Sequence, residues 1–154
     1  MLKLEKYDST PIIGKPKFRL TGDFATSLSL QTIRTLLLER NEDYFGLPIS
    51  VEVGQISFPG SGLFSKGIVT DCIIVTNTAH AKKYAKQCIT LTKQGKAAAI
   101  VEITHFGRCL AYERGTKFLS AMVGSGLADD DAAKEYYAAI YKVLSEVLPG
   151  AELI

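Results

Sequence analysis

The chain has few residues of the kinds that mark metal sites, disulfide frameworks and secreted proteins. It contains two histidines and three cysteines in 154 residues, and an odd, low cysteine count argues against a disulfide framework. No apolar run approaches the ~20 residues that a membrane-crossing helix needs. The first residues carry charges where a signal peptide would be apolar. We therefore expect a cytoplasmic protein with reduced thiols and no membrane partner.

The net charge is also small, and the overall composition is ordinary. A formal charge of +2 is too low by itself to predict nucleic-acid binding. The 47% hydrophobic and 22% charged residues are close to the globular average, which excludes a wholly disordered chain. A chain of 154 residues can bury a core without metals or disulfides. We expect one domain over 16–150, after an irregular lead-in over 1–15 and before a tail at 151–154.

Helical periodicity appears near both ends of the chain. A short strand over 17–20 precedes a turn with a capping residue, followed by a helix that extends to Arg40. A second helix is expected to begin with Asp129–Asp131, because the positive end of a helix favours acidic residues. Pro149-Gly150 is expected to stop it. Its apolar face comprises Tyr136, Ile140, Val143, Leu144 and Val147.

The middle of the chain shows the two-residue alternation of β-strands. The alternation over 49–53 changes phase at Gly54, which predicts a β-bulge there. Residues 68–76 are apolar on both faces, which favours a central strand. Further along, two strands flank a predicted two-residue hairpin turn at Gln94-Gly95, where glycine supplies a positive φ. Residues 107–128 are broken by glycines and give no clear assignment.

The element order predicts an α+β fold. We expect an antiparallel sheet of about four to six strands packed against two main helices, in the order β-α-β4-α. This order resembles that of TATA-binding-protein-like and helix-grip folds, in which two helices cover one face of a curved sheet. The resemblance concerns topology alone. Such folds host DNA binding, lipid binding and catalysis, so it implies no function.

One histidine lies close to a cysteine and an arginine in the sequence. A cysteine near His105 and Arg108 would have a lowered pKa, which makes Cys109 a candidate nucleophile and Tyr112 a neighbour to consider. Alternatively, His105 ends a strand and Cys109 is a small apolar residue, as free cysteines usually are. We favour this second interpretation. No histidine or cysteine spacing matches a structural zinc site, so no metal or cofactor is predicted.

Two arginines and two aromatic residues are candidates for ligand binding. Arg108 and Arg114 could hold a carboxylate or phosphate in a pocket, although a surface salt bridge is the commoner outcome. Phe58 and Phe64 flank a glycine-rich loop over 59–62. Apolar side chains at such a loop either mark a partner surface or fold back onto the core.

Lysines dominate one segment of the chain. Between Asp71 and Glu102 there are five lysines and no acidic residue, which could form a basic edge for an anionic partner. Lysines also protect exposed hairpins from edge-to-edge association. Nucleic-acid readers usually add arginines and exposed aromatic residues, so nucleic-acid binding is not expected. The five residues are Lys82, Lys83, Lys86, Lys93 and Lys96.

Three functional hypotheses follow. The first is a binding or interaction domain without catalytic machinery, with homodimer formation through sheet edges or the apolar loop. The second is a small enzyme or ligand carrier whose cavity lies between sheet and helices. The third is an anion binder that uses the lysines between 82 and 96. We favour the first, because two histidines and no paired acid–base residues are a poor basis for catalysis.

Overall fold

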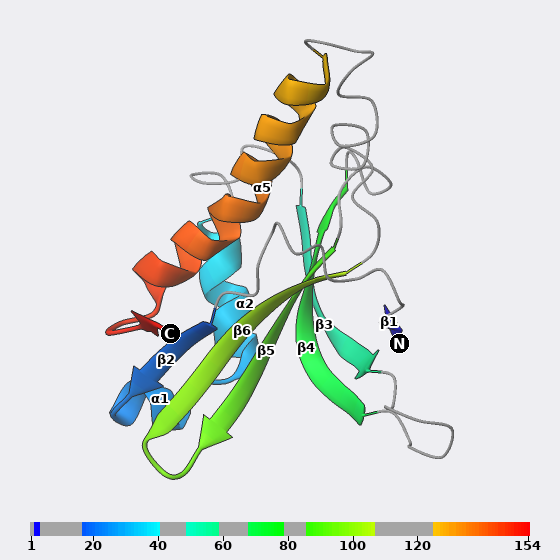
Figure 1. Cartoon of the computed structure of the whole chain (residues 1–154). Helices are drawn as coiled ribbons and strands as arrows, with labels where there is room; N and C mark the ends of the chain where they lie inside the picture. The colour runs from blue at the N-terminus through cyan, green and yellow to red at the C-terminus, as the bar shows by residue number, and fades with distance from the viewer. Residues whose placement is uncertain (1, 4–16, 41–48, 59–67, 79–85, 107–124) are drawn as a thin grey trace.

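The computed structural model describes residues 2–3, 17–40, 49–58, 68–78, 86–106 and 125–154. These residues form an α+β fold with the predicted order of strand, helix, four strands and helix (Figure 1). The elements are β1 (Leu2–Lys3), β2 (Lys17–Thr21), α1 (Asp23–Ser27), α2 (Leu30–Glu39), β3 (Ile49–Phe58), β4 (Ile68–Asn77), β5 (Lys86–Gln94), β6 (Ala98–Phe106), α5 (Ser125–Val147) and β7 (Glu152–Leu153). Within this part of the chain, no helix is long and apolar enough to cross a membrane.

The strands form one sheet in the order β1-β3-β4-β5-β6-β2-β7. From β3 to β7 each strand runs antiparallel to its neighbours, whereas the short β1 joins β3 in parallel. The strand over 68–76 was predicted to be central, and β4 confirms this by pairing on both sides. The short β7, which lies within the expected C-terminal tail, pairs with β2 at the far edge.

The main core lies between one face of the sheet and the two longer helices. On this face, odd-numbered residues of β4 and β5 such as Ile73 and Ile89 meet Ile33 of α2 and Leu144 of α5. The two helices also contact each other (Figure 1). The predicted apolar face of the last helix is confirmed: Tyr136, Ile140, Val143 and Leu144 are buried, and Val147 packs against them.

Both helical predictions need correction at their boundaries. The first helix is divided in two, because Ser29 has extended backbone and its side chain accepts a hydrogen bond from the Thr32 amide at 3.2 Å. A serine in this conformation satisfies a free helical amide, so α2 can start afresh at Leu30. The last helix begins at Ser125, so Asp129–Asp131 do not start it. Its end at Val147 agrees with the predicted stop at Pro149-Gly150, because a proline shortly after the last helical residue cannot continue the helix.

The predicted β-bulge at Gly54 is wrong. Gly54 pairs with Cys72 in a ladder that runs without interruption from Ile49 to Phe58. The apparent phase change has another cause, since Val51 is buried toward the helices and Ile56 is buried on the opposite face. A Cβ atom at position 54 would lie 2.7 Å from Cδ1 of Ile74, so the end of the Ile74 side chain would have to shift to admit one.

The close approach at Gly54 predicts a measurable steric effect. Gly54→Ala is expected to lower the free energy of unfolding by about 1 kcal/mol, because an overpacking cost of ~1–3 kcal/mol exceeds a backbone-entropy gain of ~0.5–1 kcal/mol. Ile74→Val removes the clashing Cδ1 atom. The double variant should therefore lose less stability in urea denaturation than the sum of the two single losses. Strictly additive losses would contradict the steric explanation.

The turn between β5 and β6 is longer than predicted. Gln94 pairs with Ala98, so the loop has three residues, 95–97, rather than a two-residue turn at Gln94-Gly95. The predicted positive φ of Gly95 is confirmed at 65°. The carbonyl of Ala97 accepts a hydrogen bond from Gly22, and that of Lys96 accepts one from Thr26, both at 2.9 Å. These long-range contacts favour the wider loop.

Candidate functional site

The sheet is divided by a weak junction between β4 and β5. Only three residue pairs join these strands, from Ile73↔Ile89 to Val75↔Gln87. By contrast, β3 and β4 pair over ten residues and β5 and β6 over nine. Beyond the three-pair ladder the two strand pairs diverge (Figure 1). We call the region between residues 68–72 of β4 and 90–94 of β5 the split.

Backbone polar groups of β4 are oriented toward the split. The Arg34 Nε donates to the carbonyl of Val51 at 2.8 Å, so this carbonyl of β3 faces away from β4. Residues of an antiparallel strand alternate in the neighbour that their N–H and C=O groups face. With the observed register, the backbone N–H and C=O groups of the odd-numbered β4 residues therefore point toward β5, as those of Ile73 do in the ladder. Val69 and Asp71 share this orientation but have no ladder partner in β5.

The same alternation applies on the other side of the split. Because Ile89 faces β4 in the ladder, the backbone groups of Leu91 and Lys93 also face β4. Neither residue has a ladder partner in β4. Unpaired strand edges of this kind can pair with another chain. The split thus presents two strand edges, one from each strand pair.

Exposed apolar side chains accompany these edges. Ile68 is 68% exposed and Val69 is 49% exposed, at the start of β4. On the neighbouring β3, Val53 is 41% exposed. Val53 and Val69 project from the helix-bearing face and Ile68 from the opposite face, as their register requires. Exposed apolar side chains next to an open strand edge are compatible with an interaction surface, although these three do not form one patch.

Two cysteines lie at the inner end of the split, on the face away from the helices. Cys72 and Cys88 are fully buried in a small cluster with Ile56. Cys88 pairs with Ile74, two residues from Cys72 along β4, so the two thiols are diagonal neighbours. The sequence predicted reduced thiols but not that Cys72 and Cys88 are neighbours. Their proximity depends on the register of β4 against β5. A cysteine in each predicted strand was the available signal.

A hydrogen bond links the two thiols and separates their acidities. This bond from Cys88 lowers the pKa of the Cys72 thiol, although burial and the charge of Asp71 oppose it. The same bond, together with burial, raises the pKa of the Cys88 thiol. One thiolate stabilised by one neighbouring thiol is therefore the preferred ionised form of the pair.

A second polar group is buried on the helix-bearing face. The Gln87 Nε2 donates to the carbonyl of Tyr137 at 3.3 Å and lies 3.2 Å from the His105 Nε2. In this arrangement the Gln87 amide N–H donates and the His105 Nε2 accepts. The His105 ring also contacts Tyr137 edge-on, with 4.8 Å between ring centroids. These residues connect β5, β6 and α5.

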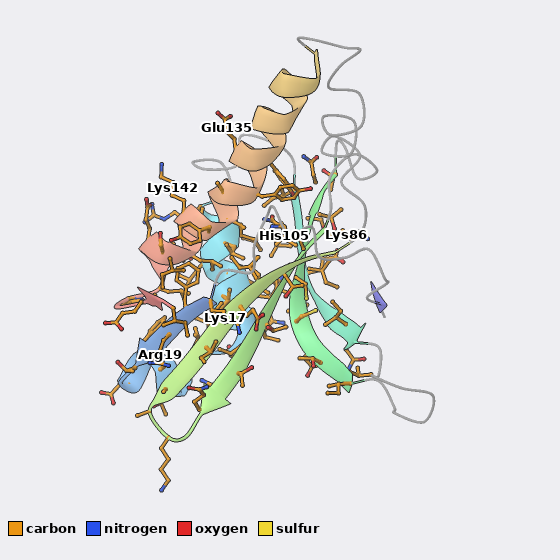
Figure 2. All side chains as sticks on the ribbon, viewed as in Figure 1. Lys17, Arg19, Lys86, His105, Glu135 and Lys142 are labelled. Carbon is orange, nitrogen blue, oxygen red and sulfur yellow. The ribbon has the colours of Figure 1, made fainter. Side chains whose placement is uncertain are left out.

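The structure places only part of the predicted catalytic group. His105 is 4% exposed and is the penultimate residue of β6, at the upper end of the strand in Figure 2. Arg108, Cys109 and Tyr112 lie outside the described residues. The predicted pairing of His105 with Cys109 therefore stays a prediction, and the described partner of His105 is Gln87.

The predicted ligand-binding residues are also mostly outside the described part of the chain. Arg114 and Phe64 are not described. The backbone of Phe58 closes the β3–β4 ladder opposite Ile68, but its side chain is not described. Within the described residues, no group of three or more histidine, cysteine, aspartate and glutamate side chains could share a metal ion.

Of the described lysines between 82 and 96, Lys86 lies apart from Lys93 and Lys96, which both contact Thr26. The Lys93 Nζ contacts the carbonyls of Ala25 and Thr26 at the end of α1, the latter at 3.2 Å. Lys86 begins β5 and Lys96 lies in the loop after it, so these two are separated by about 25 Å of strand. Lys82 and Lys83 are outside the described residues. A single basic patch is thus not formed by the three lysines that are described.

Comparison with known protein families, with curated proteins and with solved structures finds no match to this chain. A functional assignment therefore depends on the chemistry of the split and of the two buried groups beside it. Among the described residues, the split offers backbone groups without ladder partners across it, exposed apolar side chains and a pair of thiols. The His105 group offers buried polar atoms that hold helix and sheet together.

Proposed function

We propose that the chain is a binding domain that holds an extended segment of a partner polypeptide in the split. The observation that supports this is the orientation of the Val69, Asp71, Leu91 and Lys93 backbone groups, which have no ladder partners across the split. An extended peptide can add to such edges as a strand, with main-chain hydrogen bonds supplying affinity. Catalysis is not part of the proposal.

The side chains beside the split define the chemistry of the segment. On the helix-bearing face it would lie next to Val69 and Leu91, and on the opposite face next to Thr70 and Thr90. We therefore expect a segment that alternates apolar side chains with small hydroxyl-bearing ones. Asp71 is exposed on the helix-bearing side and disfavours acidic residues in the segment nearby.

A second copy of the chain is a further candidate partner, through the outer edge of β3. The short β1 pairs with β3 only at Ile56 and Ser57. Residues 49–55 of β3 have no other strand on that side among the described residues, although the Arg34 Nε already donates to the Val51 carbonyl there. Val53, exposed beside this edge, supplies an apolar contact. Antiparallel pairing of two such edges would produce a homodimer with one continuous sheet.

Proline substitution on β4 tests the proposed binding of an extended segment. Val69→Pro removes an amide that faces the split and leaves the β3–β4 hydrogen bonds unchanged, since proline is tolerated where the amide is unpaired. Linear peptides selected from a random displayed library against the full chain should bind the variant at least about tenfold more weakly, which corresponds to about 1.4 kcal/mol. Isothermal titration measures the affinity, and circular dichroism checks folding.

Val53→Pro is the matched control on the outer edge of β3. It should leave peptide affinity unchanged, and it should abolish any dimer detected by sedimentation velocity. The proposal fails if no linear peptide is selected, or if selected peptides bind the folded Val69→Pro variant as tightly as the parent chain. Loss of peptide binding in Val53→Pro alone would move the peptide site from the split to the outer edge.

A further inference from the structure

We propose that Cys72 and Cys88 are an oxidisable thiol pair, which a small hydroperoxide converts to a disulfide that links β4 to β5 at the inner end of the split. This inference concerns a modification site and does not depend on the binding of a peptide. It rests on three observations: the position of the two residues on neighbouring strands, their shared cluster, and the short ladder beside them.

The position of the cysteines allows a cross-strand bond. Both side chains project from the same face of the sheet, and Cys88 pairs with Ile74, so Cys72 is its diagonal neighbour. Diagonal Cα atoms lie about 7–8 Å apart, whereas relaxed disulfides prefer about 5.5–6 Å. Closing the bond therefore requires a small approach of the two strands. The ladder ends at Ile73↔Ile89, so the strands can approach at Cys72 without breaking a pair.

The two thiols differ in the way that stepwise oxidation requires. The hydrogen bond from Cys88 favours the thiolate of Cys72, and the thiolate is the reactive form of cysteine. Cys88 keeps its proton, because the hydrogen bond and burial raise its pKa. Cys72 is thus the attacking sulfur, and Cys88 is the second thiol that completes the disulfide.

The reaction balances with hydrogen peroxide as the oxidant. The Cys72 thiolate attacks one peroxide oxygen, so that an S–O bond forms as the O–O bond breaks, and the released hydroxide takes up the proton that Cys72 lost. The Cys88 sulfur then attacks the Cys72 sulfur. An S–S bond forms, the S–O bond breaks, and the hydroxyl leaves as water with the proton of Cys88. Two thiols are oxidised and one peroxide is reduced to two waters.

Burial makes the expected reaction selective for oxidant size. Both cysteines are 0% exposed, so a bulky aromatic disulfide reagent should not reach them in the folded chain. Hydrogen peroxide is close to water in size and needs only a small opening. The opening is expected at the split, where β4 and β5 lack ladder pairs beyond Ile73 and Ile89. The disulfide would then restrain further separation of the two strand pairs.

Peptide mapping of the oxidised chain tests the pair directly. The folded chain is treated with hydrogen peroxide, remaining thiols are alkylated after unfolding, and trypsin releases residues 67–82 with Cys72 and 87–93 with Cys88. We expect these two peptides to be joined, with the loss of two hydrogen atoms, and the peptide 109–114 with Cys109 to stay unlinked. Repeating the treatment in a Cys109→Ser chain leaves no third thiol and should give the same linked pair.

Single substitutions and pH separate the roles of the two sulfurs. In Cys88→Ala no disulfide can form, and Cys72 should gain oxygen more slowly than in the parent chain, because the hydrogen bond that favours its thiolate is lost. In Cys72→Ala the Cys88 thiol should stay reduced. In the parent chain the oxidation rate should rise with pH and level off below the ordinary cysteine pKa of 9.0, because the folded pKa of Cys72 is lowered. If Cys72 and Cys88 stay unlinked and both are alkylated after peroxide treatment, or if either links to Cys109, the inference is overturned.

Discussion

Leu144→Ala should lower the free energy of unfolding by about 3 kcal/mol, the largest loss expected from a single substitution here. Leu144 is fully buried in the main core, where α5 meets the sheet and α2. Truncation removes buried apolar surface and leaves a cavity, because the neighbours come from separate elements and cannot all move inward. Guanidinium denaturation followed by circular dichroism measures the loss.

Lys142→Ala is the matched control for this helix. Lys142 is exposed and points away from the sheet on the outer side of α5 (Figure 2). Its truncation should change stability by no more than about 0.5 kcal/mol, as is usual for surface positions. Equal losses in the two variants would mean that α5 is not anchored to the sheet by its buried apolar face.

Gln87→Met should lower the free energy of unfolding by about 2 kcal/mol. Methionine resembles glutamine in length and lacks its polar atoms, so the change removes the hydrogen bonds and largely keeps the volume. The carbonyl of Tyr137 and the His105 Nε2 each lose this amide as a neighbour, at about 1–3 kcal/mol per buried group. The substitution also removes the Gln87 Oε1, which is buried without a hydrogen-bond partner among the described residues. Removing this atom reduces the expected loss of stability.

Gln94→Met provides the comparison for Gln87→Met. Gln94 ends β5 and is exposed, so the same chemical change should be nearly neutral there. Thermal denaturation of both variants, with hydrogen exchange at α5, would show whether the loss at Gln87 loosens the contact between helix and sheet. A stability change at Gln87 no larger than that at Gln94 would contradict a structural role for the buried amide.

Local patterns predicted several helices and strands correctly. The run over 68–76, which is apolar on both faces, and the helical spacing from Tyr136 to Leu144 both correspond to observed elements. The same patterns failed at Gly54, because Val51 and Ile56 of one strand are buried on opposite faces of the sheet. A change of buried face along an unbroken strand produces the same sequence signal as a bulge.

The candidate site was much less predictable than the fold. His105 was considered as a catalytic partner of Cys109. It is buried at the junction of sheet and helix, and the side chain described within hydrogen-bond distance of it is that of Gln87. The spacing of Cys72 and Cys88 in the sequence does not indicate that they are neighbours. The register of β4 against β5 places them side by side. Lys93 was considered for anion binding, yet its ammonium contacts the carbonyls at the end of α1, far away in the sequence.

The sequence by itself determined the α+β class, the order of the elements and the buried face of the last helix. These properties follow from local periodicity, since residues that share a face recur about every 3.6 positions in a helix and every two positions in a strand. The tertiary structure decided the length of each ladder, and therefore the split, its unpaired backbone groups and the contact between Cys72 and Cys88. Ladder length depends on the twist of whole strands and on the helices packed against them, which no local pattern specifies.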